Sequence, residues 1–192
     1  MRILLRCVCL SLVALTFLPE TARAQEKAIP QSAPLAEFEA RVKKYASLRN
    51  QLNKGAAKQQ RTEHSEKIDA ASEELASRIR TERAGAKPGD IFTPEIQEFI
   101  RKLLAPEMAG QKGKDTRGSI RDEGPGPGTV KLEVNSIYPK GQPLGSMPGN
   151  VLTALPPLPE GLEYRFVNRN LLLLDVQANL IVDFMPAAIP GK

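Results

Sequence analysis

The apolar residues of this chain change their spacing partway along the sequence, and this change limits the folds that it can form. Between residues 34 and 106 they recur at steps of three and four, as on one face of a helix. From residue 129 onward they alternate with polar residues or form short apolar runs, which is typical of strands. We therefore expect an α+β fold, with a helical region at 34–106 and a small β unit at 129–186.

Two amphipathic helices come first. The first begins after Ser32, a residue suited to capping a helix N-terminus, and ends near Gly55. The second begins at Thr62 or Ser65 and ends before Gly85. Because each has one apolar stripe and a short connection joins them, we expect an antiparallel hairpin with stripe against stripe. The stripe residues are Leu35, Phe38, Val42, Tyr45, Leu48 and Leu52 in the first helix and Ile68, Ala71, Leu75 and Ile79 in the second.

The clearest helix signal lies at 93–106. Thr93 is suited to the N-cap, Pro94 to the first turn, and Pro106 ends the segment. The stripe of this helix needs an apolar partner, and so does a small sheet. We therefore expect the third helix to pack on the sheet. Its stripe consists of Ile96, Phe99, Ile100, Leu103 and Leu104.

The segment 107–128 contains six glycines and two prolines, a composition that predicts a flexible linker between the two parts. In the β unit, alternation over 130–134 predicts one strand. Three closely spaced strands follow, at 162–167, 171–175 and 180–184. We expect them to form an antiparallel meander of three or four strands.

The first 24 residues have the layout of a secretory signal peptide. A positively charged start precedes an apolar stretch that ends at Pro19, and Ala22-Arg23-Ala24 is a small-x-small cleavage site. The stretch is too short to anchor in a bilayer. We expect cleavage after Ala24, a flexible tail at 25–33, and a periplasmic or secreted mature protein with no transmembrane anchor.

Composition excludes several kinds of chemistry. Both cysteines, Cys7 and Cys9, lie in the expected signal peptide, so the mature chain would have neither disulfides nor a thiolate nucleophile. Removing residues 1–24 also takes three of the 27 basic residues and one of the 22 acidic ones, which leaves a formal charge of +3. This small charge is not typical of a nucleic-acid-binding protein.

His64 is the single histidine of the chain. A catalytic triad would have to use it, and a histidine metal site normally recruits several ligands. It lies in a polar stretch at the start of the second helix. We therefore interpret it as an exposed helix residue, and we expect no metal and no cofactor.

Two pairs of carboxylates are the remaining candidates for chemistry. Asp90 and Glu95 flank the start of the third helix, where a turn acid and an acid at the positive end of the helix dipole are common. Asp175 and Asp183 lie at the end of one expected strand and within the next, and we interpret them as turn-forming and outward-facing. Acid–base catalysis would need a cleft and a raised carboxyl pKa. We also expect Arg49, like the other basic residues of the helices, to face solvent.

Three stretches of the sequence form a recognisable combination. They are Phe38-x-x-Arg41-Val42-x-x-Tyr45-x-x-Leu48-Arg49-x-x-Leu52, then Gly89–Glu95, then Leu155–Phe184. Together they resemble a group of uncharacterised secreted proteins from environmental bacteria, and this resemblance implies export but no activity. The terminal meander is also similar to the end of small periplasmic proteins of the nickel and cobalt homeostasis type. Because the chain has one histidine, that similarity does not carry metal binding over.

The sequence therefore predicts an exported accessory or binding protein rather than an enzyme, without catalytic residues, whose partner is an unknown protein or an envelope component. The alternative is a carboxylate-dependent hydrolase of the envelope.

Overall fold

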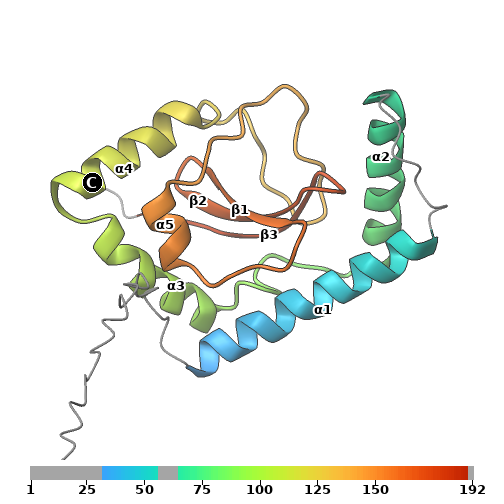
Figure 1. Cartoon of the computed structure of the whole chain (residues 1–192), viewed down its shortest axis with the longest axis horizontal. Coiled ribbons are helices and arrows are strands. Elements are labelled where there is room, and N and C mark those ends of the chain that lie inside the picture. Colours follow the sequence, from blue (N-terminus) through green and yellow to red (C-terminus); the bar gives the residue numbers. More distant parts are fainter. Residues whose placement is uncertain (1–31, 56–64, 190–192) are drawn as a thin grey trace, which may run out of the picture.

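The computed structural model describes residues 32–55 and 65–189. The predicted signal peptide, most of the predicted tail and His64 lie outside these residues. The fold is α+β, as expected, with helices around a three-stranded antiparallel sheet in the order β1-β2-β3 (Figure 1). The elements are α1 (Ala33–Gly55), α2 (Ser65–Glu82), α3 (Pro94–Glu107), α4 (Gly110–Glu123), α5 (Gly149–Ala154), β1 (Leu162–Val167), β2 (Asn170–Asp175) and β3 (Leu180–Met185).

Helices α1 and α3 begin where their capping residues predict. The Ser32 hydroxyl accepts a hydrogen bond from the Leu35 N–H at 3.3 Å, and the Thr93 hydroxyl accepts one from the Ile96 N–H at 3.4 Å. Each bond satisfies a backbone donor that the first turn of a helix leaves without an intrahelical partner.

In the view of Figure 1, α2 lies across the end of α1, and the two helices meet over only part of their length. Arg78 of α2 donates to the Leu52 carbonyl at 3.2 Å, and Arg83, just after α2, lies over the Tyr45 ring. Ile68, near the start of α2, is 58% exposed. The hairpin is therefore open at one end, because the α1 stripe is covered mainly by the sheet and by the segment before α3.

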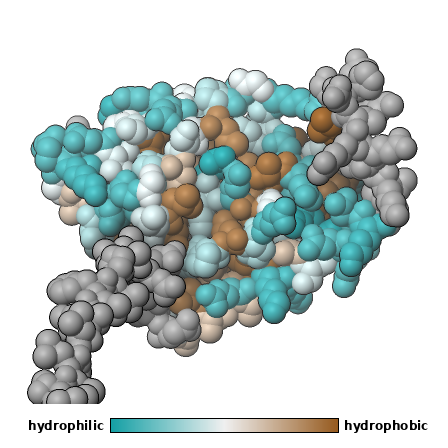
Figure 2. Space-filling model, in the orientation of Figure 1, coloured by the Kyte–Doolittle hydropathy of each residue, from teal (hydrophilic) through white to brown (hydrophobic). Residues whose placement is uncertain are grey.

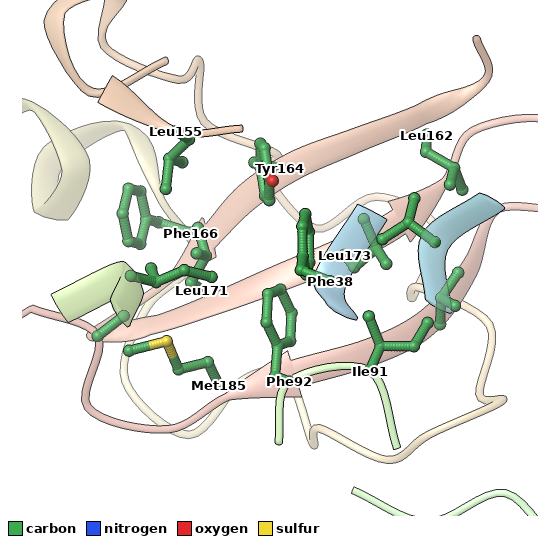
Figure 3. Packing of buried hydrophobic residues seen from close by; sticks show 14 of the residues in the cluster. Phe38, Ile91, Phe92, Leu155, Leu162, Tyr164, Phe166, Leu171, Leu173 and Met185 are labelled. Carbon is green, nitrogen blue, oxygen red and sulfur yellow. The ribbon is translucent and has the colours of Figure 1, made fainter. Parts of the chain in front are cut away.

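One apolar core joins the helices to the sheet, which confirms the expected packing of α3 on the meander. Phe38 of α1 stacks between Phe92 and Tyr164, with ring centroids 5.8 and 6.4 Å from its own (Figure 3). Phe99 is only partly buried against this core. The core contains Ile96, Ile100 and Leu104 from α3 and Tyr164, Phe166, Leu171 and Leu173 from the sheet.

The expected strand at 130–134 is wrong. Asn135 has a φ of 64°, and this left-handed conformation turns the chain before a strand can continue. The Asn135 N–H donates to the Ile181 carbonyl and the Ile181 N–H donates to the Ser136 carbonyl, both at 2.8 Å. The segment thus covers the edge of β3, while Val130 and Tyr138 pack on the second face of the sheet.

The expected flexible linker at 107–128 is also wrong, because most of it forms α4. Residues three and four apart, Gly113, Thr116 and Ile120, form its buried side. A Cβ atom on Gly113 would lie 2.2 Å from the Met108 carbonyl carbon, so α4 approaches the end of α3 as only glycine allows. Tertiary packing here outweighs the low helix propensity of glycine.

Candidate functional site

The two aspartates of the meander are completely buried on the helix-covered face of the sheet. Asp175 ends β2 and Asp183 lies in β3, and each is 0% exposed. The interpretation of Asp175 as a turn former is confirmed, whereas the expected outward orientation of both is wrong. A buried carboxylate is unfavourable unless hydrogen bonds replace its water, so the partners of each explain why it is tolerated.

Asp175 connects the end of β2 to α1. Its carboxylate accepts a hydrogen bond from the Tyr45 hydroxyl at 2.8 Å and from the backbone N–H groups of Gln177 and Ala178 at 3.0 Å each. Burial, and secondly the negative charge of Asp175, raise the pKa of Tyr45 far above its usual value. The phenol therefore stays protonated and remains a donor to Asp175.

Arg49 is the second α1 residue at this carboxylate, and its burial overturns the expectation that it faces solvent. It is 3% exposed, and its Nη1 lies 3.9 Å from the Asp175 Oδ2. Its Nη2 donates to the Glu160 carbonyl at 2.8 Å. A Cβ atom on Gly161 would lie 2.3 Å from the Arg49 Nη1, so the guanidinium packs against a glycine. The sequence contains a signal for this position, because Arg49 lies four residues after Tyr45 and therefore on the same face of α1.

Asp183 connects β3 to the segment before α3. Its carboxylate accepts hydrogen bonds from three backbone N–H groups of this segment, those of Gly89 at 3.0 Å, Ile91 at 2.7 Å and Phe92 at 2.9 Å. A fourth backbone donor is the N–H of the next residue in β3, Phe184, at 2.8 Å. A register shift opposite Leu173 and Leu174 lets both Val182 and Asp183 lie toward the helices. Bulges are not visible in an alternating sequence pattern, which is why sequence reasoning missed this role.

Asp90 and Glu95 have the local roles that the sequence predicts. The Asp90 carboxylate accepts a hydrogen bond from the Lys87 N–H at 2.8 Å and closes an exposed turn. Glu95 is an exposed acid in the first turn of α3. Asp90 therefore lies on the exposed side of the turn whose backbone N–H groups donate to the buried Asp183.

A groove of about 1080 Å³ lies between α1 and residues 82–91, and we call it the α1 groove. Its α1 wall carries residues three and four apart on one helix face, and its opposite wall is the connection from α2 toward α3. Figure 2 shows hydrophilic residues over α1, at the rim of the molecule, and apolar residues toward the middle of the face in view. The charged residues that line the groove are Glu37, Arg41, Lys44, Glu82, Arg83 and Asp90.

Arg83 joins the two walls of the α1 groove to the sheet. Its guanidinium carbon lies 5.0 Å from the centre of the Tyr45 ring, a cation–π geometry. It donates to the Asn135 side chain at 2.7 Å and to the Val182 carbonyl at 3.1 Å. Burial lowers the pKa of Arg83, while Tyr45, Asp183 and Asp90 act in the opposite direction.

Two further findings concern the described part of the chain. Among residues 32–55 and 65–189, no group of three or more His, Cys, Asp or Glu side chains is placed to hold a metal ion. Within the same ranges, no helix is both long and apolar enough to cross a membrane.

A scan against protein-family models finds no match, and neither the curated proteins nor the solved structures provide one.

Proposed function

We propose that this is an exported accessory protein that binds a protein or another component of the cell envelope in the α1 groove. One observation carries the proposal: both walls of the groove are held to the sheet by buried carboxylates. Tyr45 fixes α1 to Asp175, and the Gly89–Phe92 backbone is fixed to Asp183. A surface held in one conformation before binding loses less entropy when a partner docks.

The alternative, a carboxylate-dependent hydrolase, has less support. A general acid or base must reach the proton that it transfers. Asp175 and Asp183 are fully buried and accept hydrogen bonds from structural donors, whereas Asp90 is exposed and holds its own turn. In an accessory binding protein, Asp175 and Asp183 need only hold the walls of the groove, which they do as buried acceptors.

Export is tested by isolating the protein from the periplasm or culture medium of the organism that produces it. The mature N-terminus should be Gln25. A chain that keeps Met1 and stays in the cytoplasm contradicts the export part of the proposal.

Binding is tested by site-specific photocrosslinking in the same organism. A photoreactive residue replaces Ser47, which is exposed and lines the groove, or Lys43, which is exposed on α1 but does not line it. We expect a discrete adduct from position 47 and not from position 43. Equal adducts, or none at either position, contradict docking in the groove.

A further inference from the structure

The shape and charge of the α1 groove favour one class of occupant, and this inference rests on the proposed function. The lining residues of α1 extend from Glu37 to Gln51. At about 1.5 Å of rise per residue, this wall is roughly 21 Å long. An extended chain at about 3.3 Å per residue would place roughly six residues along it. The groove therefore has the length of a short peptide strand.

Its charges do not suit a polyanion. The lining has three acidic residues and three basic ones, so its formal charge is zero. Glu37 pairs with Arg41, at 2.6 Å between Oε1 and Nη2. Lys44 on the α1 wall and Glu82 on the opposite wall form no ion pair with another residue in the described ranges. Arg83 and Asp90 form no ion pair in these ranges either, but Arg83 donates to Asn135 and Val182 and Asp90 accepts from the Lys87 N–H. Lys44 and Glu82, on opposite walls, are thus the charged groups of the lining that have neither an ion pair nor a hydrogen bond among the described residues.

Its surface does not offer an open aromatic platform either. Single-stranded nucleic acids bind by stacking bases on aromatic faces, and sugar rings pack on the same apolar faces. Tyr45 supplies the aromatic ring among the described residues of the lining, but it is 4% exposed and Arg83 covers its face. The exposed lining instead includes Ser47 and Gln51, side chains that form hydrogen bonds with a peptide backbone.

We propose that the α1 groove binds an extended peptide segment of a partner protein, with an acidic side chain of the peptide at Lys44 and a basic one at Glu82. The two ion pairs set the direction and register of the peptide, and the polar wall of α1 contacts its backbone. Complementary charges of this kind contribute mainly to specificity.

The test is selection of peptides from a random display library by the mature chain and by charge-reversed variants. The wild-type protein should enrich peptides that carry an acidic and a basic residue at a fixed spacing. Lys44→Glu should replace the acidic preference by a basic one, with at least about a tenfold loss of affinity for the wild-type peptide. The double variant Lys44→Glu/Glu82→Lys should select the pattern with both charges inverted.

Lys43→Glu is the matched control, because Lys43 is exposed on the same helix but does not line the groove. It should select the wild-type peptides. The proposal is overturned if Lys44→Glu and Lys43→Glu select the same peptides, or if no peptide is enriched while the Ser47 adduct resists proteases and contains sugar. In either case a discrete adduct at position 47 would still support docking in the groove. Absence of any adduct at position 47 would instead contradict the proposed function.

Discussion

The two buried aspartates solve the same physical problem with different donors. Asp175 is bound partly by side chains of α1, Tyr45 and Arg49, which approach from a helix that is distant in sequence. Asp183 is bound by backbone N–H groups, three of them in one short turn and one in β3. The first arrangement depends on which residues α1 carries, whereas the second depends only on the path of the chain. The α1 wall of the groove is therefore held by particular side chains, whereas the opposite wall is held by backbone N–H groups.

The largest effect is expected at the backbone-bound aspartate. Asp183→Ala would remove the acceptor of four backbone N–H groups, and two of these donors, at Ile91 and Phe92, are buried. We expect a loss of about 3–5 kcal/mol in the free energy of unfolding, measured by urea denaturation. Asp183→Asn should restore little of this free energy, because its amide nitrogen would face N–H donors. A loss below about 1 kcal/mol in the alanine variant would show that these bonds do not hold the turn.

At Asp175 the effect of removing one donor should be smaller. Tyr45→Phe keeps the ring under Arg83 but removes the hydroxyl that donates to the carboxylate. Two backbone donors remain, so we expect a loss of about 1–2 kcal/mol in the same assay. Tyr138→Phe is a suitable control, since its hydroxyl donates to the Pro143 carbonyl, away from both aspartates. If Tyr138→Phe loses more free energy of unfolding than Tyr45→Phe, the hydroxyl of Tyr45 is not important for holding α1.

The Tyr45 hydroxyl should also change how the stability of the protein depends on alkaline pH. The pKa of Tyr45 is raised in the folded protein far above its ordinary value of 10.0. Above about pH 10 the unfolded chain releases this proton while the folded chain keeps it, so stability falls as pH rises. The stability of the wild type should therefore fall more steeply above about pH 10 than that of Tyr45→Phe, by up to roughly 1.4 kcal/mol per pH unit. Parallel curves for the two proteins would contradict the buried phenol.

The smallest effect is expected away from both aspartates. Lys140 lies within 3.1 Å of Asp69 and 3.3 Å of Glu73 on α2, but all three side chains are exposed. Exposed ion pairs contribute little because water and salt screen them. Lys140→Ala should leave the unfolding transition unchanged within error. A measurable loss would mean that α2 is held by this pair and not by its contacts with α1.

The parts of the fold that could be predicted are those set by neighbouring residues. Ser32 and Thr93 cap helices through bonds to residues three positions on, and Asn179 takes a positive φ in the turn before β3, as its side chain allows. The helix stripes and the three-stranded meander follow from spacing alone. Local chemistry is visible in a sequence because both partners lie in the same short window.

The parts that could not be predicted depend on contacts between distant segments. Helix α4 forms because Gly113 lets it approach Met108, although glycine-rich sequence favours a linker. Asp183 is turned inward by a bulge, and Arg49 is buried because Asp175 and Gly161 lie beside it. The α1 groove combines these effects, so the sequence identified several of its residues without showing that they belong together.

Hydrogen exchange tests most directly whether each aspartate holds one wall of the groove. Amide protection is compared in the wild type, Asp183→Asn and Tyr45→Phe, since local opening reports which segment a contact stabilises. We expect Asp183→Asn to lose protection at residues 89–93 while α1 keeps it. We expect Tyr45→Phe to lose protection in the second half of α1 while residues 89–93 keep it. Equal loss over both segments in both variants would contradict separate attachment of the two walls.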